Sequence, residues 1–582
     1  MSALLEVRNL DVHFGNHHAV RQLSFSIERG ETLALVGESG CGKSTTALAL
    51  MQLLPATSRL GGEVLFEGRD LVTLPRPALR RLRGDAISMI FQEPMTSLNP
   101  VLTIGHQIGE VLRLHLGLSA AAARRRAAEL LELVALPEPQ RRLDDYPHNL
   151  SGGQRQRVMI AMAVACNPRL LIADEPTTAL DVTIQAQILE LLDRLRRELS
   201  MGLLLITHDL GVVGQWADRV AVMYGGRTLE QASTEQLFTA PAHPYARGLL
   251  GASLSLDQDL HYRSERLLEI GTGSDPITGE RDFTLSSQVQ HAAFAPAPPD
   301  ATPILSLRDV HTSYASQRGP VGAVNGVSFD IAPGETVGLV GESGCGKSTL
   351  SKTILRLIDP SSGSIAFLGE DITRLSQRRL QPFRRQVQMI FQDPYASLNP
   401  RHSVADILDA ALRVHGVGQR HERERRARRI VERVGLPQTA LQRFPHEFSG
   451  GQRQRIGIAR ALVLEPSLLI CDEPVSALDV SIQAQILNLL VDLKQEFGLS
   501  YLFISHDLSV VRYIADRVLV MNGGRIVESG DHRSIWHNPV NPYTRSLIGA
   551  VPAPAFANTA QQAAAQRSKP AELPFSFYRF AL

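Results

Sequence analysis

The chain has 582 residues, of which 44% are hydrophobic and 20% charged, and its net charge is +1. This length is too great for one hydrophobic core and predicts about three or four domain-sized units. The near-neutral charge excludes a strong overall electrostatic footprint for nucleic acid. There is no apolar run long enough to cross a bilayer and no signal-like segment after Met1, so we expect a cytosolic protein that meets any membrane through partners.

Cysteine usage gives no sign of a metal site or disulfide framework. Cys41, Cys166, Cys345 and Cys471 form no CxxC pair and no metal-ligand spacing with histidine. We interpret all four as reduced, structural thiols.

An internal repeat sets the domain organisation, because the same motifs occur in the same order in both halves of the chain. We expect a first domain over 1–251, a linker over 252–303, a second domain over 304–551 and a flexible tail over 552–582. The linker has eight acidic residues against three arginines and ends in a proline cluster, which predicts a semi-extended, partly disordered segment. The aromatic end of the tail is either a frayed terminus or a docking segment.

Each half opens with strand-like sequence that leads into GESGCGKST. In the pattern G-x-x-x-x-G-K-[ST], glycines let backbone N–H groups surround phosphate oxygens, while the lysine neutralises them and the next hydroxyl coordinates Mg²⁺. The helix that follows adds the positive end of its dipole. The predicted nucleotide-binding residues are Gly37, Glu38, Ser39, Gly40, Cys41, Gly42, Lys43, Ser44 and Thr45, and Gly341, Glu342, Ser343, Gly344, Cys345, Gly346, Lys347, Ser348 and Thr349.

Two further residue types accompany each phosphate loop. Phe14 and Tyr314 stand in strand-like sequence ahead of the loops, where either ring can stack on adenine, although an aromatic residue in a strand more often belongs to the core. Gln92 and Gln392 end the apolar runs of IFQEPMTSLNP and IFQDPYASLNP. An amide oxygen there can bind Mg²⁺ or position water, and the recurrence in register with the loops favours such a role.

The middle of each half is rich in charged, helix-compatible sequence and ends in SGGQRQR. The run of arginines and glutamates over 420–436 is typical of a solvated helix with i,i+4 ion pairs rather than of a nucleic-acid site. A serine hydroxyl and two glycine amides just before a helix form an anion site without a lysine, suited to a γ-phosphate that is brought to it. The residues are Ser151, Gly152, Gly153 and Gln154, and Ser449, Gly450, Gly451 and Gln452.

The segments LLIADEP and LLICDEP predict buried parallel strands that end in two acids. Adjacent carboxylates are costly to bury without a cation or a proton to carry. We expect Asp174 and Asp472 to hold Mg²⁺ and Glu175 and Glu473 to polarise the attacking water.

A turn, TALD or SALD, follows each pair of acids, and the next strand leads to His208 or His506. A single histidine is usually an ordinary core or surface residue. Its occurrence once per half, in register after the acids, favours γ-phosphate sensing or water positioning.

With loop, Gln, SGGQ, Asp-Glu, ALD and His in this order, the chain resembles the ATP-binding cassette (ABC) family over both halves. The resemblance implies an α/β fold of two tandem nucleotide-binding domains, each with a RecA-like core, an antiparallel β subdomain and a helical subdomain. It also implies an intramolecular cassette dimer paired head to tail, in which Lys43 shares one ATP with Ser449, and Lys347 another with Ser151. Since both sites keep their Glu and His, we expect hydrolysis at both.

The SLNP blocks and the late segments HPYARGLL and NPYTRSLI resemble importers of oligopeptides, dipeptides or glutathione with two fused ATPases. This implies ATP and Mg²⁺ as ligands, two separate membrane permeases that move against the surfaces around 92–99 and 392–399, and a periplasmic or lipid-anchored binding protein. It implies a peripheral position on the cytoplasmic face of the inner membrane. Many relatives carry a cysteine cluster after the PYxR segment, and no cysteine follows Cys471, so no iron–sulfur cluster is expected.

Other assignments stay open on the sequence. Tandem cassettes that act on ribosomes or nucleic acid are the main alternative, disfavoured because their linker is usually a long basic helix whereas residues 252–303 are acidic. A fused exporter is disfavoured because it would need a membrane span. The solute, whether dipeptide, longer peptide, glutathione or nickel chelate, is contacted by other chains and is not specified here.

Overall fold

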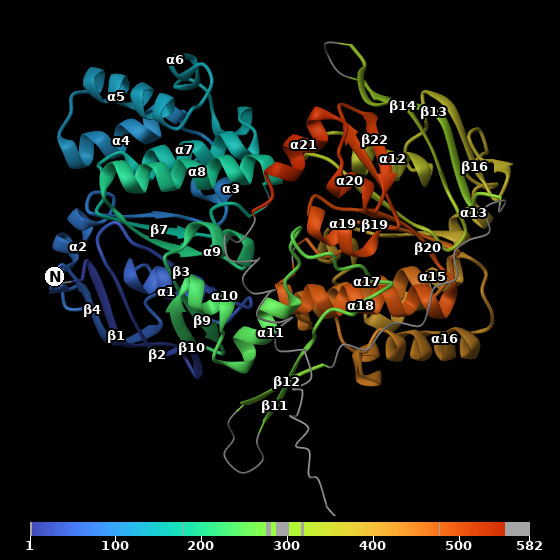
Figure 1. Ribbon diagram of the computed structural model, residues 1–582, viewed down its shortest axis with the longest axis horizontal. Coiled ribbons are helices and arrows are strands. Elements are labelled where there is room, and N and C mark those ends of the chain that lie inside the picture. Colours follow the sequence, from blue (N-terminus) through green and yellow to red (C-terminus); the bar gives the residue numbers. More distant parts are fainter. Residues whose placement is uncertain are drawn as a thin grey trace, which may run out of the picture.

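The computed structural model describes residues 3–178, 180–274, 281–286, 302–315, 319–476 and 478–552. Two halves with the same element order lie side by side (Figure 1). Within the described residues, no helix is both long enough and apolar enough to cross a membrane.

Each domain has a small antiparallel sheet that contains its N-terminal strands. The strand order is β2-β1-β4-β5 in the first domain and β14-β13-β16-β17 in the second. Alternate side chains of β1 and β13 are buried, as expected for a sheet covered on one face. The strands are β1 (Leu5–Phe14), β2 (His17–Ile27), β4 (Ser58–Phe66), β5 (Arg69–Asp70), β13 (Leu305–Tyr314), β14 (Val321–Ile331), β16 (Ser362–Phe367) and β17 (Glu370–Asp371).

A six-stranded sheet forms the core of each domain, in the orders β10-β9-β3-β8-β7-β6 and β22-β21-β15-β20-β19-β18. All neighbours are parallel except the last two strands in sequence. The strands are β3 (Thr32–Gly37), β6 (Ile87–Ile90), β7 (Leu170–Asp174), β8 (Gly202–Ile206), β9 (Arg219–Tyr224), β10 (Arg227–Ser233), β15 (Thr336–Val340), β18 (Val387–Ile390), β19 (Leu468–Asp472), β20 (Ser500–Ile504), β21 (Arg517–Asn522) and β22 (Arg525–Asp531).

The central strands β3, β7 and β8 are buried along their whole length, which explains their uninterrupted apolar sequence. Because they run parallel, their carboxyl ends meet at one edge of the sheet, and ligands of such sheets bind at this edge. Asp174 is the last residue of β7, the first phosphate loop follows β3, and His208 follows β8.

Helices cover the sheets and form a separate layer in each domain. In the first domain it consists of α4 (Ile104–Leu116), α5 (Ala120–Leu133) and α7 (Gly152–Val164), and in the second of α15 (Val404–Val414), α16 (Arg420–Arg433) and α17 (Gly450–Leu462). In α4, Ile104, Ile108 and Leu112 are fully buried at helical spacing in the cluster that also contains α5, α7 and α8. In α16, Arg420 pairs with Glu424 at 2.9 Å across i,i+4, as the sequence predicts.

The helices of the first domain are α1 (Lys43–Leu50), α2 (Arg76–Leu82), α3 (Pro94–Ser97), α4 (Ile104–Leu116), α5 (Ala120–Leu133), α6 (Pro139–Arg142), η1 (Pro147–Asn149), α7 (Gly152–Val164), α8 (Val182–Leu199), α9 (Leu210–Trp216), α10 (Thr234–Thr239) and α11 (Pro244–Ala252). Those of the second are α12 (Lys347–Ile354), α13 (Gln381–Gln386), α14 (Pro394–Ser397), α15 (Val404–Val414), α16 (Arg420–Arg433), η2 (Gln438–Gln442), η3 (Pro445–Glu447), α17 (Gly450–Leu462), α18 (Val480–Phe497), α19 (Leu508–Ile514), α20 (Ser534–His537) and α21 (Pro542–Gly549).

The segment 253–271, expected to be a semi-extended linker, is instead ordered against the second domain. Tyr262 is fully buried there, and its hydroxyl donates to Asp516 at 2.9 Å and accepts from Lys494 at 2.8 Å. Arg266 pairs with Asp492 at 2.9 Å. The order comes from partners more than 200 positions away in the sequence, which composition could not reveal.

The chain then turns back to the first domain in the hairpin of β11 (Ile270–Ser274) and β12 (Arg281–Leu285), which lies against α11. Ile270 and Phe283 pack in the cluster around Tyr245. The segment therefore contacts both domains rather than only connecting them. Residues 275–280 and 287–301, and the tail from 553, lie outside the described residues.

We expect Tyr262→Ala to destabilise the second domain by about 3–5 kcal/mol, because truncation of a buried aromatic side chain leaves a cavity and here also removes a partner of Lys494. Thermal unfolding of the full chain measures the effect. Tyr314→Ala is the control, since that ring is 44% exposed and should cost little. Equal melting temperatures for the two variants would contradict the structural role of the segment.

Candidate functional site

The two phosphate loops lie between a buried strand and a helix, as predicted. Lys43 is the first residue of α1, and the preceding Gly42 has φ 103°. A Cβ at Gly42 would lie 2.7 Å from the carbonyl oxygen of Ala19, so only glycine fits this turn. The second domain repeats the geometry with Gly346 at φ 109° before α12. The narrow loop leads directly into the helix, so an anion held by the loop would lie at a helix N-terminus.

The loop lysines are buried inside their own loops. Lys43 is 5% exposed, and its Nζ donates to the carbonyl oxygens of Gly37 at 2.6 Å and Glu38 at 3.0 Å. Lys347 does the same in the second domain, at 2.7 and 2.9 Å. The partners of this buried ammonium are neutral carbonyls, so a nearby anion would offset much of the free-energy cost of burying its charge. The lysine and its loop therefore fit a phosphate group.

A hydroxyl and a carboxylate stand beside each lysine. Ser44 donates to Asp174 at 3.1 Å and Ser348 to Asp472 at 3.4 Å. Burial raises the pKa of Asp174 to about 6 and also raises that of Asp472. These all-oxygen donors suit a hard divalent cation, which would remove the cost of the buried charge.

The neighbouring glutamate belongs to a second cluster, which gathers residues predicted separately from the sequence. Glu175 accepts from the amide of Gln92 at 2.9 Å and lies 3.4 Å from Nδ1 of His208. Glu473 accepts from Gln392 at 2.8 Å and lies 3.1 Å from His506. Both glutamates have a positive φ, 46° and 48°. Such backbone strain is common at functional sites, where a side chain is held in a fixed orientation.

Burial alone would raise the pKa of Glu175, but the hydrogen bond and charge of His208 outweigh it and hold the pKa at about 2. Burial alone would lower the pKa of His208, but its bond to Glu175 raises it. The pKa values of Glu473 and His506 shift in the same two directions for the same reasons. The pKa values of the adjacent acids are thus driven in opposite directions, and such a pair can take different roles in proton transfer.

The SGGQ segments form helix N-termini. Ser151 and Ser449 each cap the following helix in a capping box with Gln154 or Gln452. Both serines are exposed, as are Gly152 and Gly450. The exposed caps remain accessible to an anion presented by another surface.

The domains meet at the first phosphate loop through the ALD turn of the second domain. The backbone N–H of Ser39 donates to Asp479 at 2.8 Å, and Ser481 donates to Glu38 at 2.5 Å. Asp181 stays within its own domain and caps α8. These contacts across the interface were not predicted, because the sequence marked the ALD segments only as turns. The sign that the sequence offered was that an ALD segment follows the pair of acids in both halves.

The remaining predicted residues surround the loops. The Tyr314 hydroxyl lies 3.2 Å from that of Thr349, and the ring is 44% exposed, so it is available for stacking. Phe14 is half-buried and packs against the core of the first domain. Thr178, not singled out from the sequence, donates to Glu175 at 2.9 Å.

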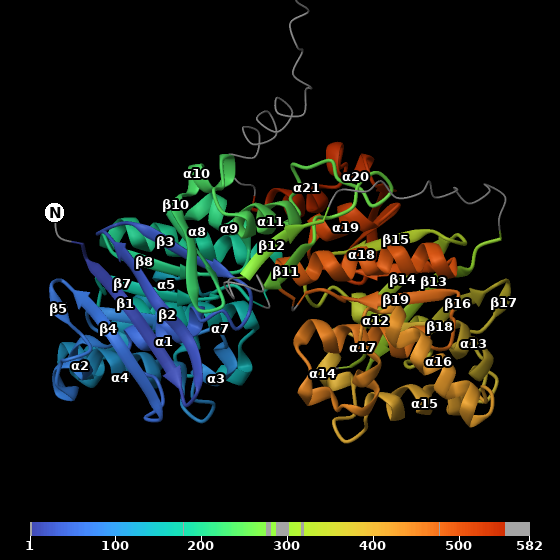
Figure 2. The same ribbon diagram turned by 90° about the horizontal axis from the view of Figure 1, so that it is seen from below.

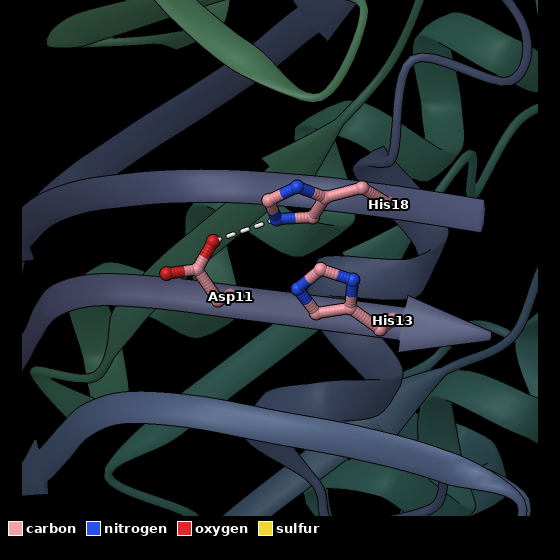
Figure 3. Close-up of side chains that lie close together, drawn as sticks. All are labelled: Asp11, His13 and His18. Atoms are coloured by element: carbon pink, nitrogen blue, oxygen red, sulfur yellow. Dashed lines mark hydrogen bonds and ion pairs between the residues drawn. The ribbon is translucent and has the colours of Figure 1, made fainter. Parts of the chain in front are cut away.

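A separate cluster of Asp11, His13 and His18 lies on β1 and β2 (Figure 3). His18 Nε2 lies 2.7 Å from Asp11, and the two imidazole rings stack with centroids 3.8 Å apart and planes at 19°. A metal ion bound by both rings must lie near both ring planes, about 2.0–2.1 Å from each nitrogen, and nearly parallel planes do not meet at such a point. Three arginines line the adjoining cavity and further disfavour a cation. We assign the cluster to a hydrogen-bonded stack.

Comparisons with known proteins identify the family of this chain. The ABC transporter family model matches residues 20–178 and 324–476, and that of the oligopeptide/dipeptide transporter C-terminal region matches 229–273 and 527–575. The chain is 50% identical to the Glutathione import ATP-binding protein GsiA of Salmonella typhimurium and to that of Escherichia coli O157:H7, over 94% of this chain and 89% of each relative. The solved structure of cbiO1 from Clostridium perfringens, part of the ABC transporter complex cbiONQ, is 30% identical over 40% of this chain, with a TM-score of 0.37.

Both family models match once in each half, so the repeat seen in the sequence is also a repeat of the family regions. The expectation of two tandem α/β ABC domains is thereby confirmed. The chain belongs to the ABC transporter family, as an ATPase subunit with two ABC domains.

Proposed function

We propose that the chain is the ATP-hydrolysing subunit of a glutathione importer, attached to the cytoplasmic face of the inner membrane through two integral permeases and supplied by a periplasmic or lipid-anchored binding protein. The observation that carries this proposal is the 50% identity, over 94% of the chain, to relatives named for glutathione import. Small peptides are a second candidate solute, favoured by the oligopeptide/dipeptide C-terminal regions at the end of both domains.

ATP supplies the terminal phosphoryl group whose transfer to water provides the free energy, and Mg²⁺ neutralises charge on its oxygens. Lys43, now bonded to its loop carbonyls, would turn to the phosphates, and Ser44, Asp174 and Gln92 would supply oxygen ligands for the cation. In the second domain Lys347, Ser348, Asp472 and Gln392 have the same roles.

Glu175 stays ionised beside the Mg²⁺ ligand Asp174 and can accept a proton from the attacking water. His208 holds this carboxylate from one side and Gln92 from the other. Glu473, His506 and Gln392 form the same arrangement in the second domain. Two intact clusters support hydrolysis at both sites.

We propose that each site is completed by the opposite domain, with Ser449 to Gln452 closing over the phosphate held by Lys43, and Ser151 to Gln154 over that held by Lys347. Two bonds support this pairing, because they bring the second domain against the first loop: Ser39 donates to Asp479 of the opposite ALD turn, and Ser481, at the start of the following helix α18, donates to Glu38. Closure of the two domains on ATP then changes the surface presented to the permeases.

The surface around the IFQ blocks has the exposed apolar side chains expected of a permease contact. Phe91 is 39% exposed, Phe391 37% and Tyr395 53%. In Figure 2 the short helices α3 and α14, which follow the glutamines, both lie toward the lower side of the molecule, whereas α10 and α20 lie toward the upper side. Both domains can therefore meet the membrane subunits on one side.

Mg²⁺ binding at the first site is expected to weaken in acid. Asp174, with a pKa of about 6, holds a proton below that pH, and the metal ion must displace it. Between pH 7 and pH 5 we expect about a tenfold loss of affinity. Calorimetry with a non-hydrolysable ATP analogue, in a Lys347→Ala background that leaves only the first site, measures it. The Asp174→Asn variant lacks this carboxyl group, so the pH dependence of its affinity comes from titration of the nucleotide and not from residue 174. If the Lys347→Ala chain and its Asp174→Asn derivative lost affinity equally between pH 7 and pH 5, Asp174 would not be the metal ligand.

The proposed function is tested by reconstituting the chain with its permeases and binding protein in liposomes and measuring ATP hydrolysis. We expect glutathione to stimulate hydrolysis several-fold and unrelated solutes to have no effect. Dipeptides, oligopeptides and nickel chelates are the comparison ligands. Stimulation by dipeptides alone would favour the second candidate, and recovery with ribosomes instead of membrane proteins would reject both.

A further inference from the structure

The repeated PY segment near the end of each domain places a tyrosine beside a phosphate loop. Tyr543 lies in the first turn of α21, and its hydroxyl accepts a 3.0 Å hydrogen bond from the backbone N–H of Glu342, in the second phosphate loop. The side chain of Asn541 caps α21 by accepting from the backbone N–H of Tyr543 at 2.9 Å. The hydroxyl is therefore held by a helix that is itself fixed at its N-terminus.

The same helix contacts the opposite domain. α21 lies against α8, which begins directly after the ALD turn of the first domain (Figure 1). In the reciprocal position α11 lies against α18, and Val480 at the start of α18 packs in the cluster around Tyr245. Each of these two C-terminal helices thus connects its own phosphate loop with the helix that follows the ALD turn of the other domain.

The pKa values of both tyrosines are raised, mainly by burial. The pKa of Tyr543 rises to about 12, with smaller contributions from the charge of Glu342 in its own loop and from that of Asp181 in the opposite domain. Burial also raises the pKa of Tyr245, with a contribution from Asp479. At neutral pH both hydroxyls therefore keep their protons, so Tyr543 can serve as a neutral, fixed acceptor for the loop N–H.

The two copies differ in the strength of this contact. Tyr245 is fully buried beside the first loop, and the backbone N–H of Glu38 faces its hydroxyl and lowers its pKa, but the pair does not reach the geometry of a full hydrogen bond. In that domain the loop residues Glu38 and Ser39 are instead engaged by Ser481 and Asp479 of the second domain. The chain therefore contains its own matched control for the bond made by Tyr543.

We propose that Tyr543 is a positioning residue for the phosphate loop of the second domain, and that α21 transmits movement of this loop to α8 of the first domain. Nucleotide binding at one site is thereby coupled to the interface that completes the other. The proposal rests on ATP binding at the phosphate loops, and it does not depend on which solute is imported.

The bond is tested by Tyr543→Phe in a Lys43→Ala background, where only the second site binds nucleotide. Loss of the acceptor leaves the Glu342 N–H unpaired, and we expect ATP to bind roughly 3- to 10-fold more weakly than to Lys43→Ala alone. Tyr245→Phe in a Lys347→Ala background is the matched control, with a change below about twofold. Equal melting temperatures before and after each Tyr→Phe change confirm that the fold is kept.

The coupling is tested in the otherwise unmodified chain by the ATP dependence of hydrolysis. We expect the Hill coefficient to fall toward 1 in Tyr543→Phe and to stay unchanged in Tyr245→Phe, a difference that general destabilisation would not produce. Unchanged affinity and cooperativity in Tyr543→Phe, or equal losses in the two variants, would overturn the proposal. Absence of nucleotide binding by the unmodified chain would instead reject the ATPase function itself, so the two failures are distinguishable.

Discussion

Replacing Glu175 or Glu473 by glutamine is expected to lower hydrolysis at the altered site by 10²- to 10⁴-fold, the usual contribution of a positioned general base. The amide keeps the size of the side chain but cannot accept a proton from water, and it loses the ion pair with His208 or His506. ATP binding should be retained, because the loop lysines are unchanged. Steady-state turnover and equilibrium ATP binding separate the two effects.

The two single variants should lose activity equally, and the double variant should lose nearly all of it. The reason is that both clusters have the same members at similar distances, with Gln at 2.9 and 2.8 Å and His at 3.4 and 3.1 Å. Thr178→Ala provides a milder control, since it removes one hydrogen bond to Glu175 and keeps the carboxylate. A full loss from Glu473→Gln with no loss from Glu175→Gln would show that the first site is inert.

Ser449→Glu, made in a Glu473→Gln background, is expected to lower the remaining turnover at least 100-fold. In that background only the site of Lys43 and Glu175 works, and the head-to-tail pairing closes it with the SGGQ segment of the second domain. A carboxylate there would face the phosphate oxygens, where repulsion between like charges in a partly dry site costs several kcal/mol. Hydrolysis rates at saturating ATP measure the loss.

The matched control is Ser151→Glu in the same Glu473→Gln background, which should leave the remaining turnover nearly unchanged. Ser151 caps α7 in the same way as Ser449 caps α17, and both serines are exposed, so the two changes are structurally equivalent. If each domain completed its own site, the outcome would be reversed and Ser151→Glu would be the inactive variant. The comparison therefore decides which domain completes each site.

The sequence by itself determined the parts of this protein that depend on a few consecutive residues. Each phosphate loop needs a glycine at a position with φ above 100° and a lysine as the first residue of the next helix. The nine-residue segment GESGCGKST meets both requirements. The repeat of the motifs, confirmed by the family matches in both halves, predicted two α/β ABC domains. The buried strands ending at Asp174 and Asp472 were recognisable for the same reason, because burial on both faces demands a continuous apolar run.

Only the tertiary structure decided the features that join distant residues. Burial raises the pKa of Asp174 despite the hydrogen bond from Ser44, whereas His208 lowers the pKa of Glu175, and both partners come from other elements. The order of the segment 253–271 depends on Lys494 and Asp516, and its acidic composition did not foretell this burial. The bond between Ser39 and Asp479 joins residues 440 positions apart. Composition and spacing describe a segment and its near neighbours, whereas burial and pairing free energies arise only when folding brings such partners together.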